Sequence, residues 1–163
     1  MTVHVLDESP KTDAAFGTSP DDRTLEQRLA SGFILVDKPA GPTSHQLAAW
    51  ARDLLGLDRL GHGGTLDPFA TGVLPLMTGR CMKITNKILK HQKTYIAVFR
   101  FRTMPVINDL KATMATMTGR IYNVPPEVSA VKVQVRTRTI HAFELLDTDG
   151  QDAVARITCD AGT

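Results

Sequence analysis

The sequence has few of the features that mark membrane proteins or disulfide-built domains. Its two cysteines, Cys81 and Cys159, lie far apart and form no Cys-x-x-Cys pair, which argues against a zinc cluster and against a fold held by disulfides. No run approaches the roughly 18 to 20 apolar residues that a membrane helix needs. The first 31 residues are polar and acidic and lack the layout of a signal peptide. We therefore expect a cytoplasmic protein with no membrane partner.

The sequence also lacks the common fingerprints of bound cofactors. It contains no Gly-x-x-x-x-Gly-Lys-Ser/Thr loop, no Gly-x-Gly-x-x-Gly at the start of a helix and no Gly-x-Ser-x-Gly elbow. Its five histidines are scattered, with no His-x-x-x-His pair, so we predict no metal site. Any chemistry is expected to proceed without a cofactor.

Positive charge is concentrated in the middle of the chain. The net charge is only +2, yet residues 80–138 hold twelve basic side chains against two acidic ones, an excess of ten. Residues 1–31 hold six acidic and three basic ones. A basic segment in a near-neutral chain indicates an anion-binding face, for which nucleic acid is the commonest large partner. The alternative is an ordinary solvated surface of lysine and arginine.

The order of apolar and turn-forming segments predicts a mixed α/β (α+β) domain with antiparallel pairing near its C-terminal end. Residues 1–31 are expected to form a variable or disordered arm, apart from a short helix at 24–30. Residues 33–36 resemble a buried strand. A helix follows, capped by Thr43 or Ser44, ended by Gly56, and carrying its apolar residues on one face. That face comprises Leu47, Trp50, Ala51, Leu54 and Leu55.

Beyond a glycine-rich loop over residues 56–72, the pattern alternates between strands and helices. Strands are predicted at 73–77 and at 94–102, the second with apolar residues on both faces, as in a central strand. A helix is expected at 106–117. Two further strands, 139–148 and 153–159, flank Asp149-Gly150, which is a strong hairpin signal.

Residues 80–90 are expected to form a helix with a basic stripe. Its members recur at i, i+3, i+7 and i+10 and are Arg80, Lys83, Lys87 and Lys90. Such a stripe suits contact with RNA phosphates, which adds affinity without reading sequence. A solvated helix face is the alternative.

The loop over residues 61–68 (GHGGTLDP) is the most unusual segment of the chain. Its glycines let a backbone approach a ligand closely. Asp67 precedes a proline, which favours an extended backbone and presents the carboxylate in a defined direction. Taken alone, an Asp-Pro pair in such a loop is more often a turn than a site.

Four sequence blocks that occur in a particular order change the interpretation of the Asp-Pro pair as a simple turn. They are residues 36–45 (VDKPAGPTSH), 61–75 (GHGGTLDPFATGVLP), 93–95 (KTY) and 125–132 (PPEVSAVK). Over residues 31–163 this series resembles the TruB/dyskerin family of RNA pseudouridine synthases. Ser44-His45 before an Ala-Trp helix, and the 129–132 block followed by Arg136, are more similar to the archaeal and eukaryotic branch. Members of that branch usually work with an H/ACA guide RNA and small ribonucleoprotein proteins.

The resemblance implies a pseudouridine synthase fold, a mainly antiparallel mixed sheet flanked by helices, and a role for particular residues. Asp67 matches the catalytic aspartate, which acts on uridine of tRNA or rRNA without a cofactor, as a nucleophile or as a base. Tyr95 matches the tyrosine that stacks on the flipped base, and His62 a loop histidine near the substrate. Lys38 matches a supporting lysine, and residues 129–132 are expected to pack beside the loop.

Each of these residues also has a plain structural interpretation. Tyr95 would be an ordinary core tyrosine of a strand, His62 a surface loop histidine, and Lys38 a turn charge paired with Asp37. From the residue pattern alone these alternatives stay open.

The chain departs from the family pattern at its end. In the family, the motif at residues 161–163 continues into an arginine that pairs with the aspartate. We expect residues 32–163 to be the N-terminal part of the catalytic domain, with its remainder and the PUA domain absent and little activity alone. Two other functions remain open: a stand-alone synthase of the tRNA T-loop, and a non-catalytic RNA-binding scaffold.

Overall fold

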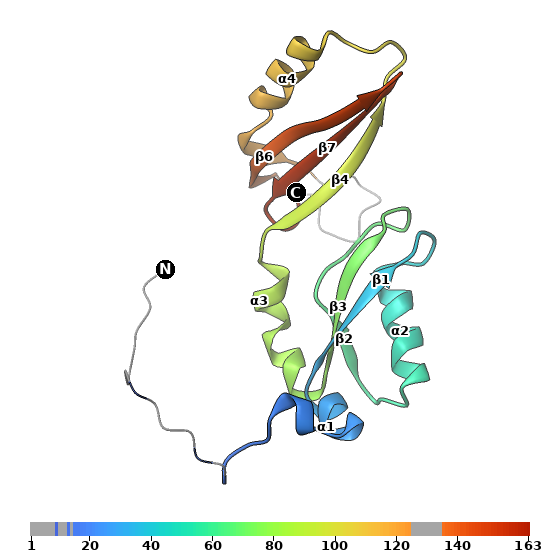
Figure 1. Cartoon of the computed structure of the whole chain (residues 1–163), viewed down its shortest axis with the longest axis vertical. Coiled ribbons are helices and arrows are strands. Elements are labelled where there is room, and N and C mark those ends of the chain that lie inside the picture. The colour runs from blue at the N-terminus through green and yellow to red at the C-terminus, as the bar shows by residue number, and fades with distance from the viewer. Residues whose placement is uncertain (1–8, 10–12, 14, 125–134) are drawn as a thin grey trace. The chain divides into compact units, whose positions relative to one another are not determined.

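The chain is represented by a computed structural model that describes residues 9, 13, 15–124 and 135–163 (Figure 1). It divides into two compact units, Met1–Thr85 and Asn86–Thr163, each with its own antiparallel sheet. The predicted block at 129–132 lies outside the described residues. The expected class, antiparallel sheet flanked by helices, is confirmed.

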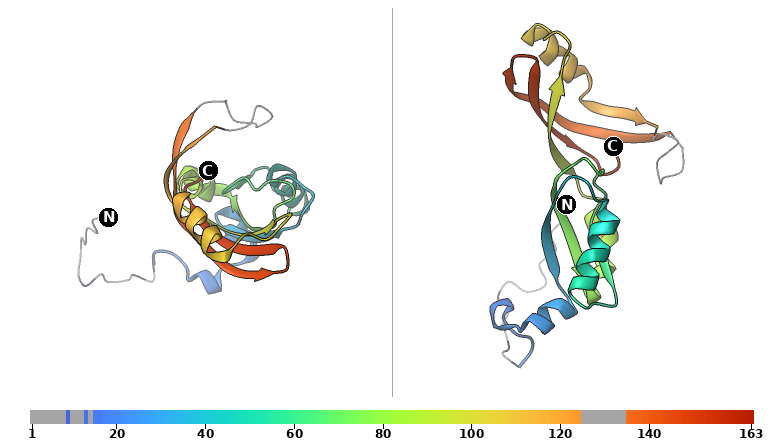
Figure 2. Two further views of the ribbon diagram at one scale, coloured as in Figure 1. Left: turned by 90° about the horizontal axis from the view of Figure 1, so that it is seen from above. Right: turned by 90° about the vertical axis from the view of Figure 1, so that its right-hand side faces the viewer.

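The sheet of the first unit has three strands in the order β1-β3-β2. They are β1 (Phe33–Lys38), β2 (Leu60–His62) and β3 (Gly72–Thr78), and β3 pairs antiparallel with both neighbours. Helix α2 (Ser44–Leu54) lies along one face of this sheet in each view of Figures 1 and 2. Its Ala48 is buried with Leu74 and Leu76 of β3 to form the core.

Helix α2 turns a different face to the core than its apolar stripe predicted. Leu47, Ala48 and Ala51 pack on the sheet, whereas Trp50 is 58% and Leu54 86% exposed. A helix approaches a sheet most closely through small side chains, and the two alanines provide that surface. The apolar face predicted from the sequence is therefore not the face that packs on the sheet, because Trp50 and Leu54 lie outside the contact.

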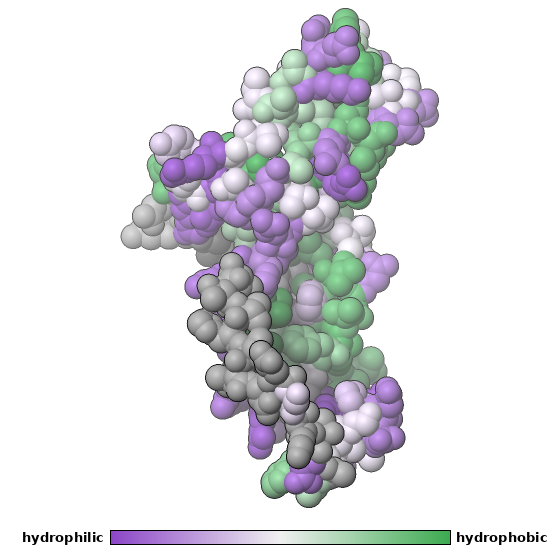
Figure 3. All heavy atoms as spheres, turned by 60° about the vertical axis from the view of Figure 1, so that its left-hand side comes forward, coloured by the Kyte–Doolittle hydropathy of each residue, from purple (hydrophilic) through white to green (hydrophobic). Residues whose placement is uncertain are grey.

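Strand β1 is covered on one side only, although its apolar run predicted a buried strand. Ile34 and Val36 face α2, while Phe33, Leu35 and the neighbouring Val73 of β3 are exposed. Successive side chains of a strand point to opposite faces, so covering one face buries only alternate residues. Figure 3 shows hydrophobic residues gathered on the molecular surface in both units.

The N-terminal region contains two short helices. They are the 3₁₀ helix η1 (Pro20–Asp22) and α1 (Leu25–Ala30). Thr24 caps α1 in a reciprocal capping box with Gln27, so the helix predicted over residues 24–30 is confirmed. A variable arm over residues 1–31 stays a prediction.

The basic segment is not one continuous α-helix. It begins as the 3₁₀ helix η2 (Gly79–Ile84) and continues as the short helix α3 (Thr85–Leu89). A 3₁₀ helix has three residues per turn instead of 3.6, so the segment does not keep one α-helical repeat. The predicted single α-helix is therefore wrong, while all four basic residues are exposed.

The sheet of the second unit has four strands in the order β4-β7-β6-β5. The elements of this unit are β4 (Lys93–Arg100), α4 (Ile107–Thr116), β5 (Gly119–Asn123), β6 (Arg136–Asp149) and β7 (Asp152–Cys159). The β6–β7 hairpin turns at Gly150, whose φ of 57° is a left-handed conformation that suits glycine. The predicted hairpin and the predicted helix at 106–117 are confirmed.

Strand β4 lies at an edge of its sheet and not at the centre. It pairs with β7 along one side, and among the described residues no strand pairs with its other side. Ile96 and Val98 are 63% and 65% exposed on one of its faces. The unpaired edge of such a strand is a surface to which further strands can add.

Asp160 ties the end of β7 to β6. Its carboxylate accepts hydrogen bonds from His141 Nε2 at 2.8 Å and from the Thr139 backbone N–H at 2.9 Å. The bond from His141, followed by that from Thr139, lowers the pKa of the Asp160 carboxyl despite partial burial, which raises it. The ionised carboxylate therefore stabilises the folded chain.

We predict that Asp160→Asn destabilises the chain near neutral pH and that the difference from wild type disappears in acid. A carboxyl with a lowered folded-state pKa contributes stability above its unfolded pKa, roughly 3.9, and loses it as the pH falls through the folded value. Urea unfolding from pH 7 to pH 3 measures this. Asp58→Asn, at an exposed carboxylate, is the control, and a pH-independent difference for Asp160→Asn would contradict the prediction.

None of the helices in the described part of the chain has the length and apolar character needed to cross a membrane. Within the same residues, no group of three or more histidine, cysteine and acidic side chains is arranged to hold a metal ion.

Candidate active-site loop

The candidate catalytic residue lies in the connection from β2 to β3. Residues 63–71 form this loop, and Asp67, Pro68 and Phe69 at its tip are exposed. The Ala70 N–H donates to the Asp67 carbonyl at 3.0 Å, which closes a tight turn over residues 67–70. The glycine-rich segment therefore presents Asp67 on a folded turn that starts from a strand.

The side chain of Lys38 holds the Asp67 turn through the backbone carbonyls of the turn. This side chain is fully buried, and the three N–H groups of Nζ are shared among four backbone carbonyls, those of Pro39 at 2.9 Å, Asp67 at 3.2 Å, Pro68 at 3.3 Å and Ala70 at 2.8 Å. A buried ammonium needs such acceptors because it has lost its hydration shell. Three of the four acceptors belong to the Asp67 turn.

The alternative interpretation of Lys38, a turn charge paired with Asp37, does not describe the structure. Neighbouring side chains of β1 point to opposite faces, so Lys38 is buried while Asp37 is exposed. Among the described residues, Lys38 forms no ion pair with a carboxylate. Its charge is stabilised by carbonyl dipoles alone.

Ser44 holds the same loop one residue earlier. Its side chain is 1% exposed, and its Oγ accepts the Leu66 N–H at 2.9 Å and donates to the Leu66 carbonyl at 3.3 Å. Thr43, not Ser44, is the N-cap of α2, in a capping box with Gln46. The hydroxyl of Ser44 is therefore available to the loop.

Sequence reasoning did not identify this role for Ser44. A signal was present, because Thr43-x-x-Gln46 is a capping-box spacing that assigns the cap to Thr43 and leaves the next hydroxyl without a helical function. The partner of that hydroxyl lies 22 positions along the chain, which local pattern does not reveal.

A backbone contact completes the attachment. The Gly41 N–H donates to the Pro68 carbonyl at 2.8 Å, and Gly41 has a φ of 114°, a conformation suited to glycine. On the other side, the buried Gly63 donates its N–H to the Pro75 carbonyl of β3 at 2.7 Å. The loop is thus held by the β1–α2 connection and by β3.

His62, the last residue of β2, is half-buried beside the loop. Its Nδ1 lies within hydrogen-bonding distance of the Gly64 carbonyl, and its ring stands edge-on to that of His45 with centroids 6.5 Å apart. Because a carbonyl only accepts, Nδ1 carries the proton and Nε2 remains the ring nitrogen that other groups can use. His62 is therefore more constrained than a surface loop histidine.

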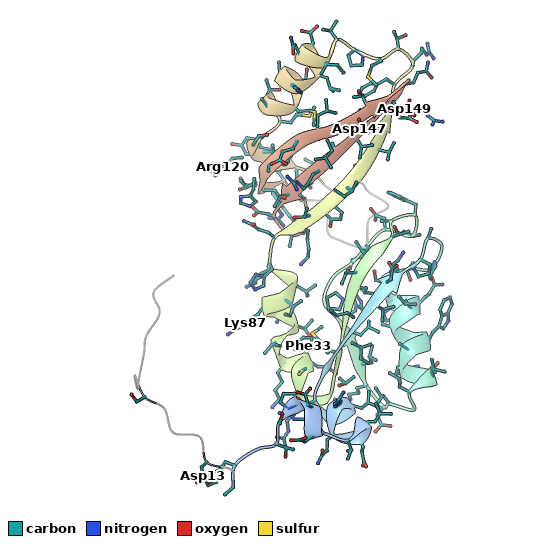
Figure 4. The ribbon with its side chains drawn as sticks, viewed as in Figure 1. Asp13, Phe33, Lys87, Arg120, Asp147 and Asp149 are labelled. Atoms are coloured by element: carbon teal, nitrogen blue, oxygen red, sulfur yellow. The ribbon has the colours of Figure 1, made fainter. Side chains whose placement is uncertain are left out.

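The other predicted binding residues lie elsewhere. Tyr95 lies in β4 of the second unit, opposite Ile157 of β7, and is 38% exposed, so it is not a fully buried core tyrosine. Arg80 and Lys83 lie on η2 in the first unit, and Lys87 and Lys90 in the second. Lys87 extends away from α3 (Figure 4). Within the described part of the first unit, Lys38 is the predicted residue that contacts the Asp67 turn.

Comparison with known proteins identifies the class. Residues 52–163 match the family described as TruB family pseudouridylate synthase (N terminal domain), and residues 4–48 match the DKCLD (NUC011) domain. The chain therefore belongs to the TruB family of pseudouridylate synthases, as its motifs predicted.

Curated relatives in archaea have similar sequences. The chain is 40% identical over 152 residues to the probable tRNA pseudouridine synthase B of Methanothermobacter thermautotrophicus, a match that covers 93% of this chain and 47% of the relative. It is 41% identical to the protein of that name from Pyrobaculum calidifontis, covering 93% and 46%. The chain thus spans about half the length of these relatives.

Solved structures of H/ACA proteins have the same fold. A chain of a Cbf5–Nop10–Gar1 complex superimposes with a TM-score of 0.86 at 36% identity, covering 96% of this chain and 48% of the other. A chain of an H/ACA ribonucleoprotein bound to a substrate RNA containing 2'-deoxyuridine gives 0.83 at 32% identity, covering 96% and 46%. These similarities agree with the predicted archaeal and eukaryotic branch.

We predict that Lys38→Met lowers the free energy of unfolding by about 3 kcal/mol. The substitution keeps the length of the side chain but leaves the four backbone carbonyls without their charged donor, and hydrogen bonds to charged groups contribute roughly 1.5 to 3 kcal/mol each. Urea unfolding measures the loss. Lys87→Met, at an exposed lysine, should stay within about 0.5 kcal/mol of wild type; equal effects of the two substitutions would contradict the prediction.

Proposed function

We propose that this chain carries the catalytic loop of an RNA pseudouridine synthase and that Asp67 is its catalytic carboxylate. The observation that carries the proposal is the contrast within the loop, whose backbone is held by the buried Lys38 and Ser44 while the Asp67 side chain is exposed. Catalysis requires a reacting group in a defined position, and a rigid backbone supplies it. Membership of the family supports the reaction type.

The reaction is an isomerisation that needs no redox partner. The bond between C1' of the ribose and N1 of uracil breaks, and a bond between C1' and C5 forms, with a proton lost from C5 and one gained at N1. The Asp67 carboxylate either attacks the ribose or removes a ribose proton. Because a stacked uracil is out of reach of any carboxylate, the target nucleotide is flipped out of the RNA.

Two further residues have proposed roles near the base. Tyr95 supplies an aromatic surface on which the flipped base stacks, a contact that contributes roughly 1 to 3 kcal/mol in other RNA-binding sites. His62 presents Nε2 beside the loop as a donor or acceptor toward the substrate. Both roles are carried over from the family motif.

We propose a guide-dependent enzyme that works on tRNA or rRNA with small ribonucleoprotein proteins. The similar solved chains come from complexes with Nop10 and Gar1 and from an H/ACA ribonucleoprotein with substrate RNA. A second candidate function is a stand-alone synthase of the tRNA T-loop, which the name of the curated relatives, tRNA pseudouridine synthase B, favours. A cytoplasmic location remains a prediction.

The variant Asp67→Asn tests whether the chain acts as an enzyme or as a non-catalytic RNA-binding scaffold. It removes the carboxylate while conserving shape, so we expect loss of tritium release from [5-³H]uridine RNA with RNA affinity nearly unchanged. The assay uses the 163-residue chain and a chimera extended by the remaining part of the Methanothermobacter relative, each on bare tRNA and on guide-paired RNA. Asp58→Asn is the control. Turnover within a few-fold of wild type in Asp67→Asn would rule out the proposed role.

RNA contact by the exposed basic residues is tested separately. We expect Arg80→Ala and Lys83→Ala each to weaken RNA binding equally for unrelated sequences and to reduce the slope of log K against log salt by about 0.7 to 0.9, because each phosphate contact releases a counterion. Fluorescence anisotropy over a salt series measures this. Lys111→Ala, at an exposed lysine of α4, is the matched control; an unchanged slope would show that Arg80 and Lys83 do not contact RNA.

A further inference from the structure

Asp67 lies between two peptide groups that are held by different side chains. The peptide group that precedes it carries the Leu66 carbonyl, which accepts the Ser44 hydroxyl at 3.3 Å. The peptide group that follows it carries the Asp67 carbonyl, which accepts Lys38 Nζ at 3.2 Å. Because φ and ψ of a residue are the rotations of these two groups about its Cα, holding both of them sets the direction of the Cα–Cβ bond.

Ser44 is well suited to hold the first of these peptide groups. A hydroxyl is both a donor and an acceptor, and Ser44 uses both functions on the two sides of Leu66. At 1% exposure, water does not compete for these bonds. Its own backbone lies in the first turn of α2. Alanine supplies neither bond, and no other described side chain bonds to Leu66.

We propose that Ser44 is a positioning residue that sets the direction of the Asp67 carboxylate, with Lys38 acting on the following peptide group. This inference rests on the proposed function for its catalytic consequence, but its structural part stands apart from it. Ser44 does not touch the reacting atoms, so its removal should lower kcat through misplacement of Asp67 and leave KM for RNA unchanged.

The first test is spectroscopic and uses the 163-residue chain labelled with ¹⁵N. In Ser44→Ala, the Leu66 amide should exchange with solvent roughly tenfold faster, as expected from the loss of its buried acceptor, and the HN–Hα coupling of Asp67 should shift toward an averaged value. The Leu55 amide, which donates to Ala51 within α2, is the internal reference. Unchanged Leu66 exchange or an unchanged Asp67 coupling overturns the proposal.

The second test is kinetic and separates positioning from loss of fold. Thr43→Ala removes the helix cap next to Ser44 and lowers stability, but it leaves the Ser44 hydroxyl in place. We expect Ser44→Ala to reduce kcat about tenfold or more at constant KM, corresponding to ~1.4 kcal/mol, whereas Thr43→Ala leaves kcat unchanged below its unfolding temperature. A rise in KM alone, or equal losses of kcat in both variants, overturns the proposal.

The spectroscopic and kinetic tests together distinguish a failure of this proposal from a failure of the proposed function. If Asp67→Asn retains turnover, the assignment of Asp67 fails, and the exchange and coupling measurements still decide whether Ser44 holds the loop. If Asp67→Asn is inactive while Ser44→Ala has normal kcat despite a freely exchanging Leu66 amide, the proposed function stands and Ser44 is not a positioning residue.

Discussion

The first unit depends on a single buried charge. The ammonium of Lys38 lies between the β1–α2 connection and the β2–β3 loop, within hydrogen-bonding distance of one carbonyl of the former and three of the latter. A charge removed from water is tolerated only where dipoles replace its hydration, so the two segments must converge on Nζ for the chain to fold around it. The position of the Asp67 turn is therefore a condition of burying Lys38.

The same arrangement separates the backbone of the loop from its reactive group. Lys38, Ser44 and the Gly41 N–H all bind main-chain atoms of residues 66–70, and among the described residues none of these groups bonds to the Asp67 carboxylate. The loop is therefore rigid without neutralising its acid. Because Lys38 binds carbonyls and not the carboxylate, the side chain of Asp67 is left to interact with other groups.

Much of the secondary structure could be predicted from the sequence. The helices at 25–30 and 107–116 and the hairpin around Gly150 follow from caps, periodicity and turn residues, all of which act over a few positions. Three predictions failed for non-local reasons. The side of α2 that faces the sheet depends on which residues permit close approach, the basic segment tightens into a 3₁₀ helix, and strand order decides whether β4 lies at an edge.

At the candidate site, too, some features could be predicted from the sequence and others depended on the tertiary structure. The sequence by itself determined the family and made Asp67 the candidate acid, because the motifs around Asp67 can be recognised along the chain without knowing the fold. Only the tertiary structure decided how that acid is held. Lys38 is 29 positions from Asp67 and Ser44 is 22 positions from Leu66, and their contacts exist only after β1, α2 and β3 have packed. A lysine beside an aspartate in a turn is an ion pair by local reasoning; burial on the opposite face of the strand makes it a support for the loop, because desolvation and not proximity in sequence selects its partners.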